Sequence, residues 1–344
     1  MSPAGADRPA DRPEMSRERA RAERRDVDKE RGEPLAGARG GKRALRRMGR
    51  PLDAWTSRPR ILVTNDDGIE SHGILALKRA LEAVGDVVVV APDSNQSAVG
   101  HQKTLTRPLR VRERTLPDGS VGYAIDGSPT DCVSLGLLGF FDEKFDLVAS
   151  GINYGANLGD DLTYSGTVSA AMEAIINSTP AFAISQEYSE QVDFRLAGVA
   201  AAVVARNILE HGLRHGELLN VNVPAVAPED CAGIEVTRLG KRVYQDQLIG
   251  RVDPRGMPYY WIGGPPPSGI ALPGTDFHAI VNRRVSVTPV HLDLTGRRLL
   301  RELPSWGWAL DLAAVAPGPE EAERLRPTPV ERERFAEETQ LERR

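Results

Sequence analysis

Two adjacent aspartates carry the strongest chemical signal in this sequence. Asp66 and Asp67 follow the apolar run of residues 61–63 and precede Gly68. Neighbouring carboxylates at the end of a buried strand are costly to desolvate unless a cation lies between them. Gly68 permits a sharp turn that would let both carboxylates face one point, whereas consecutive side chains of a continuing strand point in opposite directions. The pattern therefore predicts a divalent metal site, although an Asx-turn followed by a helix cap explains these residues alone equally well.

Two further polar segments strengthen the metal interpretation. Residues 93–97 follow an apolar run that ends at Ala91, and residues 151–159 follow another that ends at Ser150. Hard cations such as Mg²⁺ and Mn²⁺ prefer oxygen ligands. A serine hydroxyl and an asparagine carbonyl from these segments would complete a site begun by the two aspartates, with positions left for water and substrate. Each segment alone is an ordinary turn, but three of them in one sheet indicate a site.

A second chemical feature is the start of a predicted helix at Ser165, Gly166 and Thr167. Free backbone N–H groups and the helix dipole favour an anion at such a position. Ser165 as the N-cap residue is compatible with that role. The surrounding spacing matches neither a Walker A loop nor the dinucleotide-binding fingerprint. A metal held by carboxylates beside an anion-binding helix start favours phosphoester hydrolysis.

The elements that would position these residues alternate along the chain. Short apolar runs predict strands, and stretches with apolar residues on one face predict helices. The expected strands cover residues 60–64, 87–91, 145–150, 181–185 and 218–223, and the expected helices cover residues 73–84, 130–140, 166–176 and 194–213. This alternation indicates an α/β fold with helices on both faces of a parallel sheet and ligands at the carboxyl ends of its strands. Residues 285–290 alternate weakly, as an antiparallel strand does.

Composition limits the class of protein. The 344 residues are 40% hydrophobic, enough for one large core or two smaller ones. The net charge of −4 argues against a general nucleic-acid binder, and it is uneven: residues 1–50 hold 15 Lys/Arg and nine Asp/Glu, a balance of +6 that leaves −10 for the rest. Two cysteines make no disulfide framework, and no Cys/His cluster suggests zinc. Without a secretory signal or a membrane-spanning apolar stretch, we expect a cytoplasmic protein that binds neither membranes nor specific nucleic acids.

Both ends of the chain and its late region differ from the alternating part. Residues 1–57 and 317–344 are rich in charge, and we expect a disordered extension and a mobile tail there. From about residue 234, Gly, Pro and Tyr become frequent. This late region predicts either an arm used for self-association or a hairpin that only covers the core.

The same motifs resemble the SurE (survival protein E) family of metal-dependent 5′-nucleotidases. The resemblance spans roughly residues 59–310, and its motifs occur in the order of that family. The matching segments are residues 61–69, residues 91–93 with Ser97, and residues 126–133, 151–159, 164–168, 220–224, 274–276 and 288–289. Two departures stand out, because His72 replaces a common proline and residues 283–284 replace a common Gly-Tyr pair.

The resemblance implies a fold, an activity and a set of site residues. The fold is a Rossmann-like three-layer α/β/α sandwich with a mainly parallel sheet in residues 58–310, plus a C-terminal β arm, within about residues 234–295, exchanged in a homodimer or homotetramer. The activity is release of phosphate from nucleoside 5′-monophosphates, with 3′-monophosphates and short polyphosphate as further substrates, using one Mg²⁺ or Mn²⁺ per subunit. The implied metal ligands are Asp66, Asp67, Ser97 and Asn153. For phosphate we expect Asn157, Ser165, Gly166 and Thr167.

Several alternatives stay open at this point. Asp66 or Asp67 is expected to act in catalysis, either by taking a proton from an attacking water or, for Asp66, as a nucleophile that forms an aspartyl-phosphate. His72 and His101 lie near the expected site, where each is either a proton donor or a solvated bystander. A non-catalytic nucleotide-binding module and a nicotinamide-dependent oxidoreductase are the competing functions, but the carboxylate pair and the missing glycine fingerprint argue against them.

Overall fold

The computed structural model describes residues 57–243, 247–263, 268–308 and 318–333. The disordered extension expected over residues 1–57 therefore lies outside the described residues except for its last position. The mobile tail expected over residues 317–344 is described only in part.

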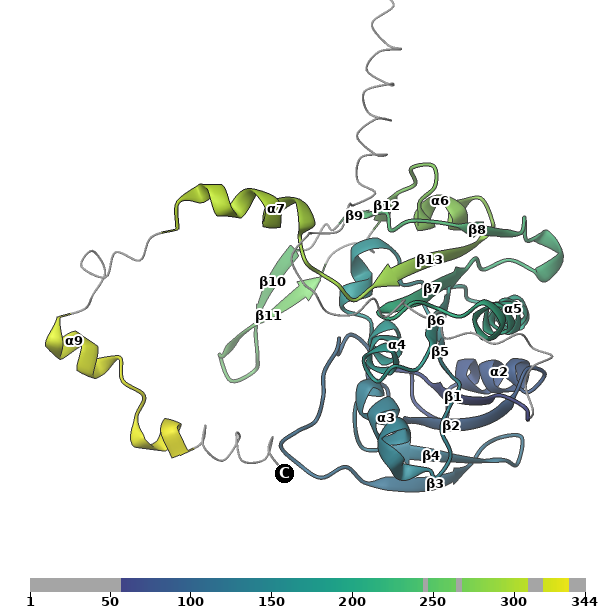
Figure 1. The fold of residues 1–344 in the computed structure, drawn as a ribbon, viewed down its shortest axis with the longest axis horizontal. Helices are drawn as coiled ribbons and strands as arrows, with labels where there is room; N and C mark the ends of the chain where they lie inside the picture. Colours follow the sequence, from purple (N-terminus) through teal and green to yellow (C-terminus); the bar gives the residue numbers. More distant parts are fainter. Residues whose placement is uncertain (1–56, 244–246, 264–267, 309–317, 334–344) are drawn as a thin grey trace, which may run out of the picture. The chain divides into compact units, whose positions relative to one another are not determined.

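A nine-stranded sheet forms the centre of the fold (Figure 1). In order across the sheet, its strands are β3 (Val111–Thr115), β4 (Val121–Ile125), β2 (Asp86–Pro92), β1 (Arg60–Thr64), β5 (Leu147–Tyr154), β6 (Ala181–Gln186), β7 (Glu217–Val223), β13 (Val285–His291) and β8 (Ile234–Val236). The neighbouring strands from β4 to β7 are all parallel. The pairs β3–β4 and β7–β13 are antiparallel, as the weak alternation of residues 285–290 predicted for β13.

Helices cover both faces of this sheet. Figure 1 shows α2 (His72–Leu81) and α5 (Arg195–His211) on one face, and α3 (Pro129–Leu135) and α4 (Gly166–Ile176) on the other. Each pair of helices contributes to its own hydrophobic cluster with the sheet between them. The predicted three-layer α/β/α arrangement with a mainly parallel sheet is therefore confirmed.

The boundaries of several elements differ from the sequence prediction. Helix α4 has the predicted bounds, but α3 ends at Leu135 and continues only as a π-helical turn, Gly136–Phe140. Two glycines in that turn lower the helix propensity of the segment. Strands β3 and β4 were not predicted, because β3 is an edge strand whose mostly exposed, charged residues show no apolar period. Strand β5 also extends four residues past its predicted end.

The late region holds elements of two kinds. Strands β8 and β13 belong to the main sheet, and β10 (Gln247–Val252) pairs with β11 (Pro258–Gly263) in a separate antiparallel hairpin. Several of the hairpin's large apolar side chains are exposed, among them Tyr260, Trp261 and Ile262.

The remaining short elements of the described chain are β9 (Lys241–Val243), β12 (Ser268–Ile270), α6 (Asp276–Val281), α7 (Arg297–Glu302), α9 (Pro319–Arg324), η3 (Gly159–Thr163), η4 (Pro228–Asp230) and η5 (Leu303–Trp306). Within the described ranges, no helix combines the length and the apolar character needed to cross a membrane.

Candidate active site

The candidate site lies where the chain changes direction across the sheet. Strand β1 has β2 on one side and β5 on the other, and both pairs are parallel. In open α/β sheets this arrangement leaves a crevice beyond the carboxyl ends of the strands, where ligands bind. The three polar segments singled out in the sequence follow or end β1, β2 and β5. The topology therefore brings them to one edge of the sheet.

The turn after β1 is held by Asn65 rather than by the aspartates. The buried Asn65 side chain donates to Gly68 O (3.0 Å) and Ser71 Oγ (2.7 Å) and accepts from Gly68 N (3.2 Å). Gly68 has a φ of +98°, a conformation that side-chain-bearing residues rarely adopt. Ser71 in turn caps α2 by accepting from Ile74 N. The Asx-turn and helix cap are therefore present, but they leave Asp66 and Asp67 available for another task.

Asp66 is the buried member of the pair. Its side chain accepts from Thr167 Oγ1 at 2.5 Å and from Thr167 N at 3.1 Å, at the start of α4. Gly166 makes this approach feasible, since a Cβ there would lie 2.9 Å from Asp66. Burial raises the pKa of Asp66, and the hydrogen bonds from Thr167 offset only part of that rise. Asp66 is thus a desolvated carboxylate fixed against a helix start.

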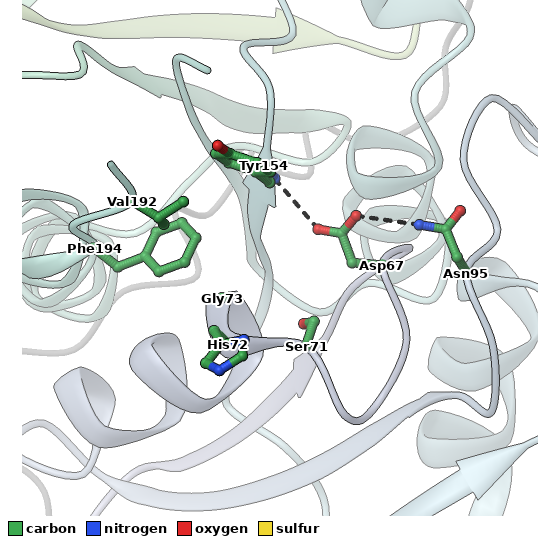
Figure 2. Close-up of a pocket in the computed structure, with 8 residues that line it drawn as sticks. All are labelled: Asp67, Ser71, His72, Gly73, Asn95, Tyr154, Val192 and Phe194. Carbon is green, nitrogen blue, oxygen red and sulfur yellow. Dashed lines mark hydrogen bonds between the residues drawn. The ribbon is translucent and has the colours of Figure 1, made fainter. Parts of the chain in front are cut away.

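Asp67 is half-buried and faces open space (Figure 2). Its Oδ2 accepts from Tyr154 N at 3.3 Å, and its Oδ1 lies 3.5 Å from Asn95 Nδ2. Burial and the neighbouring charge of Asp66 raise the pKa of Asp67 to about 6. Neither Asp66 nor Asp67 forms an ion pair with Lys, Arg or His in the described part of the chain. The pair therefore holds negative charge that no described side chain compensates.

The predicted neutral ligands lie on the two flanking segments. Asn153, near the end of β5, donates from Nδ2 to Gly155 O at 2.7 Å, which leaves its Oδ1 without a donor among the described residues. Ser97 is exposed on the loop after β2 and donates to Asn95 Oδ1 at 2.7 Å. Asn95, which contacts both Ser97 and Asp67, was missed by the sequence analysis. Its only signal there was membership of the polar run 93–97.

The predicted phosphate residues make contacts within the fold. Ser165 caps α4 by accepting from Val168 N, and Thr167 donates to Asp66. Asn157 donates from Nδ2 to Ser185 Oγ at 2.7 Å, at the end of β6. Its backbone is held by Asn222 and Asn220, which lie in the next strand, β7. The structure therefore brings Ser165, Gly166 and Thr167 to the aspartates and places Asn157 over β6 and β7.

A pocket of about 590 Å³ opens in front of Asp67. Figure 2 shows Asp67 and Asn95 on one side, with Tyr154, Val192 and Phe194 forming an apolar wall; Ser71, His72 and Gly73 complete the lining. The rings of Tyr154 and Phe194 meet edge to face, with centroids 6.4 Å apart. This wall was not predicted from the sequence, because its residues lie at the end of β5 and just before α5, where side chains show no periodic pattern. His72 lines the pocket, whereas His101 contacts Glu173 instead.

The donor set fits a hard divalent cation. No group of three or more His, Cys, Asp or Glu side chains with metal-binding geometry occurs in the described residues. An ion at the aspartate pair would therefore complete its shell with neutral oxygens and water, as Mg²⁺ commonly does. Each carboxylate oxygen of Asp66 accepts one hydrogen bond and retains a lone pair. The uncompensated charge and the free Asn153 Oδ1 both suit such an ion.

Comparisons with known proteins agree with this architecture. The family described as "Survival protein SurE" matches residues 61–246. A protein named 5′-nucleotidase SurE from Chloroflexus aggregans is 54% identical over 250 residues, which cover 72% of this chain and 99% of that protein. A protein of the same name from Geobacter sulfurreducens is 50% identical over 258 residues, covering 75% and 95%.

The solved structure of a SurE protein from Aquifex aeolicus is similar as well. It is 42% identical to this chain, with a TM-score of 0.62 over 72% of this chain and 99% of the other. The matched residues 61–246 contain the aspartate pair, the loop after β2, the end of β5 and helix α4. From the sequence motifs, the sheet and these matches together, the chain belongs to the SurE family.

Proposed function

We propose that this protein is a divalent-metal-dependent phosphomonoesterase that hydrolyses nucleoside 5′-monophosphates to nucleoside and phosphate. The observation that carries the proposal is the pocket in which the Asp67 carboxylate lies opposite the apolar wall of Tyr154, Val192 and Phe194, with Asp66 adjacent in the sequence. The carboxylate suits metal-assisted phosphate chemistry, and the apolar wall suits binding of a nucleoside. The relatives from Chloroflexus aggregans and Geobacter sulfurreducens carry the name 5′-nucleotidase, which supports the same conclusion.

One divalent cation, Mg²⁺ or Mn²⁺, would be held by Asp66 and Asp67 with Ser97 and Asn153. When bound, such an ion polarises a phosphoryl oxygen and lowers the pKa of water. Asp66 is held in place by Thr167, so it enters the site with little conformational freedom. Asp67 lines the pocket and is held only by the longer contacts with Asn95 and Tyr154.

The two aspartates differ in their fitness for proton transfer. Both oxygens of Asp66 accept hydrogen bonds from Thr167, which disfavours Asp66 as a nucleophile. Asp67 Oδ1 has only the long contact with Asn95 and is the atom suited to take a proton from the attacking water. Rapid-quench trapping with labelled substrate tests this assignment. A hydroxylamine-labile phosphoenzyme would overturn the water route in favour of an aspartyl-phosphate.

The start of α4 would support the phosphate. Its dipole favours negative charge, and Ser165, Gly166 and Thr167 lie next to the aspartates. Asn157 retains a second N–H donor beyond the one given to Ser185. Thr167 already gives its N–H and its hydroxyl to Asp66, so charge that redistributes on the phosphoryl group would be stabilised by the helix dipole, the Ser165 hydroxyl and Asn157.

The aromatic wall would bind the nucleoside. Tyr154, Val192 and Phe194 present apolar surface that stacks with any base, which fits a broad rather than a base-specific preference. A panel of nucleoside 5′- and 3′-monophosphates and short polyphosphate, assayed for phosphate release with and without chelator, tests the function. We expect metal-dependent release, fastest for 5′-monophosphates. Binding of nucleotide without release under any metal would favour the non-catalytic module.

We also propose that the protein assembles as a homodimer or homotetramer in the cytoplasm. Supporting this are the exposed side chains of the β10–β11 hairpin, including Tyr260, Trp261 and Ile262. Such a surface is larger than single scattered apolar residues and is typical of an interface. Deleting residues 247–263 and measuring the mass in solution tests the assembly. A monomeric full-length protein would contradict it.

A further inference from the structure

A buried carboxylate outside the aspartate pair is tied to the loop that follows β2. Glu173 lies on α4 with a side chain that is 5% exposed. His101 Nε2 lies 3.2 Å from its Oε2, and Lys103 Nζ donates to its Oε1 at 2.9 Å. Burial alone would raise the pKa of Glu173, but hydrogen bonds from His101, Ser134 and Lys103 lower it to about 2. Glu173 is therefore ionised at neutral pH, and Lys103 of the loop forms an ion pair with it.

The same loop carries the residues that reach the site. Asn95 contacts Asp67, and Ser97 contacts Asn95. Between Ser97 and His101, the backbone of Ala98 adopts a φ of +58°, which is unfavourable for a residue with a Cβ. Strained conformations of this kind persist only where the surroundings hold them. Gln96 N donates to Asp66 O at 2.7 Å on the near side of Ala98, and further contacts on the far side hold the rest of the loop.

Those contacts converge on acidic residues of α3 and α4. Besides the two links to Glu173, Thr104 donates to Asp131 from its N at 2.8 Å and from its Oγ1 at 2.7 Å. Gly100 N donates to Tyr164 O at 3.1 Å, just before α4. Helix α4 therefore holds Asp66 at its first turn and the loop at its third. One helix therefore contacts both Asp66 and the loop that bears Asn95 and Ser97.

We infer that Glu173 is a positioning residue that fixes the loop bearing Asn95 and Ser97 relative to Asp66 and Asp67. It contacts neither metal nor substrate, and its role for metal binding rests on the proposed function. Loss of its charge leaves Lys103 and His101 without their partner, so residues 95–104 would lose their fixed position. The expected consequence is weaker metal binding with little change in the core.

Hydrogen exchange on the full-length protein in chelator tests this inference without reference to activity. In Glu173→Gln we expect amides of residues 97–104 to exchange about tenfold faster than in the wild type, with α4 unchanged. The Mn²⁺ dissociation constant should rise by about tenfold, and kcat should fall more than KM rises. The matched control is Asn177→Ala, because Asn177 donates to Glu173 from the C-cap position of the same helix and does not contact the loop. Its exchange and Mn²⁺ affinity should equal those of the wild type.

A second variant covers the case in which Glu173→Gln fails to fold. The double variant His101→Asn with Lys103→Met removes the same two links from the half-exposed loop side, where no core packing is lost. Faster exchange of residues 97–104 in either variant supports the inference. Unchanged exchange and unchanged Mn²⁺ affinity in a folded variant overturn it. If the wild type releases no phosphate, the proposed function fails while the exchange data still decide the role of Glu173.

Discussion

The two sides of the carboxylate pair differ more than their adjacency suggests. Asp66 lies on the closed side, where helix α4 donates twice to its side chain and Gly166 leaves it room. Asp67 lies on the open side, where it lines a pocket with Tyr154 and is held by longer contacts. Asp66 is buried and hydrogen-bonded, as polar residues in a protein core are, whereas Asp67 is partly exposed in a pocket, as residues of a binding surface are. We infer that the two neighbouring aspartates have different roles, with Asp66 anchoring the site and Asp67 facing the substrate.

The largest expected effect comes from the open side. Asp67→Asn removes the carboxylate that faces the pocket, and we expect kcat/KM for a nucleoside monophosphate to fall by about 10³-fold or more. The fold should remain intact by circular dichroism. Asp160→Asn, an exposed aspartate in η3, serves as the matched control and should retain wild-type rates. Near-normal turnover of Asp67→Asn at saturating metal would show that the metal assignment is wrong.

A smaller effect is expected when the closed side is loosened. Thr167→Val removes the hydroxyl that donates to Asp66 at 2.5 Å while keeping the volume, so kcat/KM should fall by about 10- to 100-fold. Thr167→Ser retains the hydroxyl and should restore most of the rate. Steady-state kinetics over a metal titration measures both. Equal rates for the valine and serine variants would show that the Thr167 hydroxyl does not contribute to turnover.

The pocket wall should affect binding rather than the chemical step. Phe194→Ala removes part of the stacking surface, and we expect KM for adenosine 5′-monophosphate to rise by about tenfold with kcat nearly unchanged. Ribose 5-phosphate, which lacks a base, should show no such change and is the matched control substrate. An equal rise in KM for both substrates would mean that Phe194 shapes the site as a whole.

The smallest effect concerns stability without metal. In the folded state the pKa of Asp67 is about 6, above the ordinary 3.8. The stabilising contribution of its proton is therefore complete below pH 3.8 and is lost as the pH rises to about 6. Asp67→Asn has no such proton to lose, so in chelator its melting temperature should equal that of the wild type near pH 4. At pH 7 it should exceed that of the wild type by about 2–4 °C, a value already reduced for the solvent exposure of Asp67. Equal melting temperatures of the wild type and Asp67→Asn at pH 7 would contradict the inference that the charge of Asp67 is uncompensated.

The sequence predicted the closed side better than the open side. Strand β1, helix α4 and the aspartates were found because apolar runs and N-cap residues give local signals. Asn95, Tyr154 and Phe194 were missed as site residues, because their roles depend on loops that meet only after the sheet forms. The edge strand β3 was missed for a related reason, since its charged residues owe their strand conformation to pairing with β4. Contacts between distant segments have no periodicity to detect.

Metal binding to the paired aspartates is the most direct test of the account. Titration of the metal-free protein with Mn²⁺, followed by calorimetry or by the paramagnetic signal of the free ion, gives the number of sites and their affinity. We predict one site per chain in the wild type and in Asp160→Asn, and loss of that site in Asp67→Asn. Unaltered Mn²⁺ binding by Asp67→Asn would place the ion elsewhere and contradict the central claim.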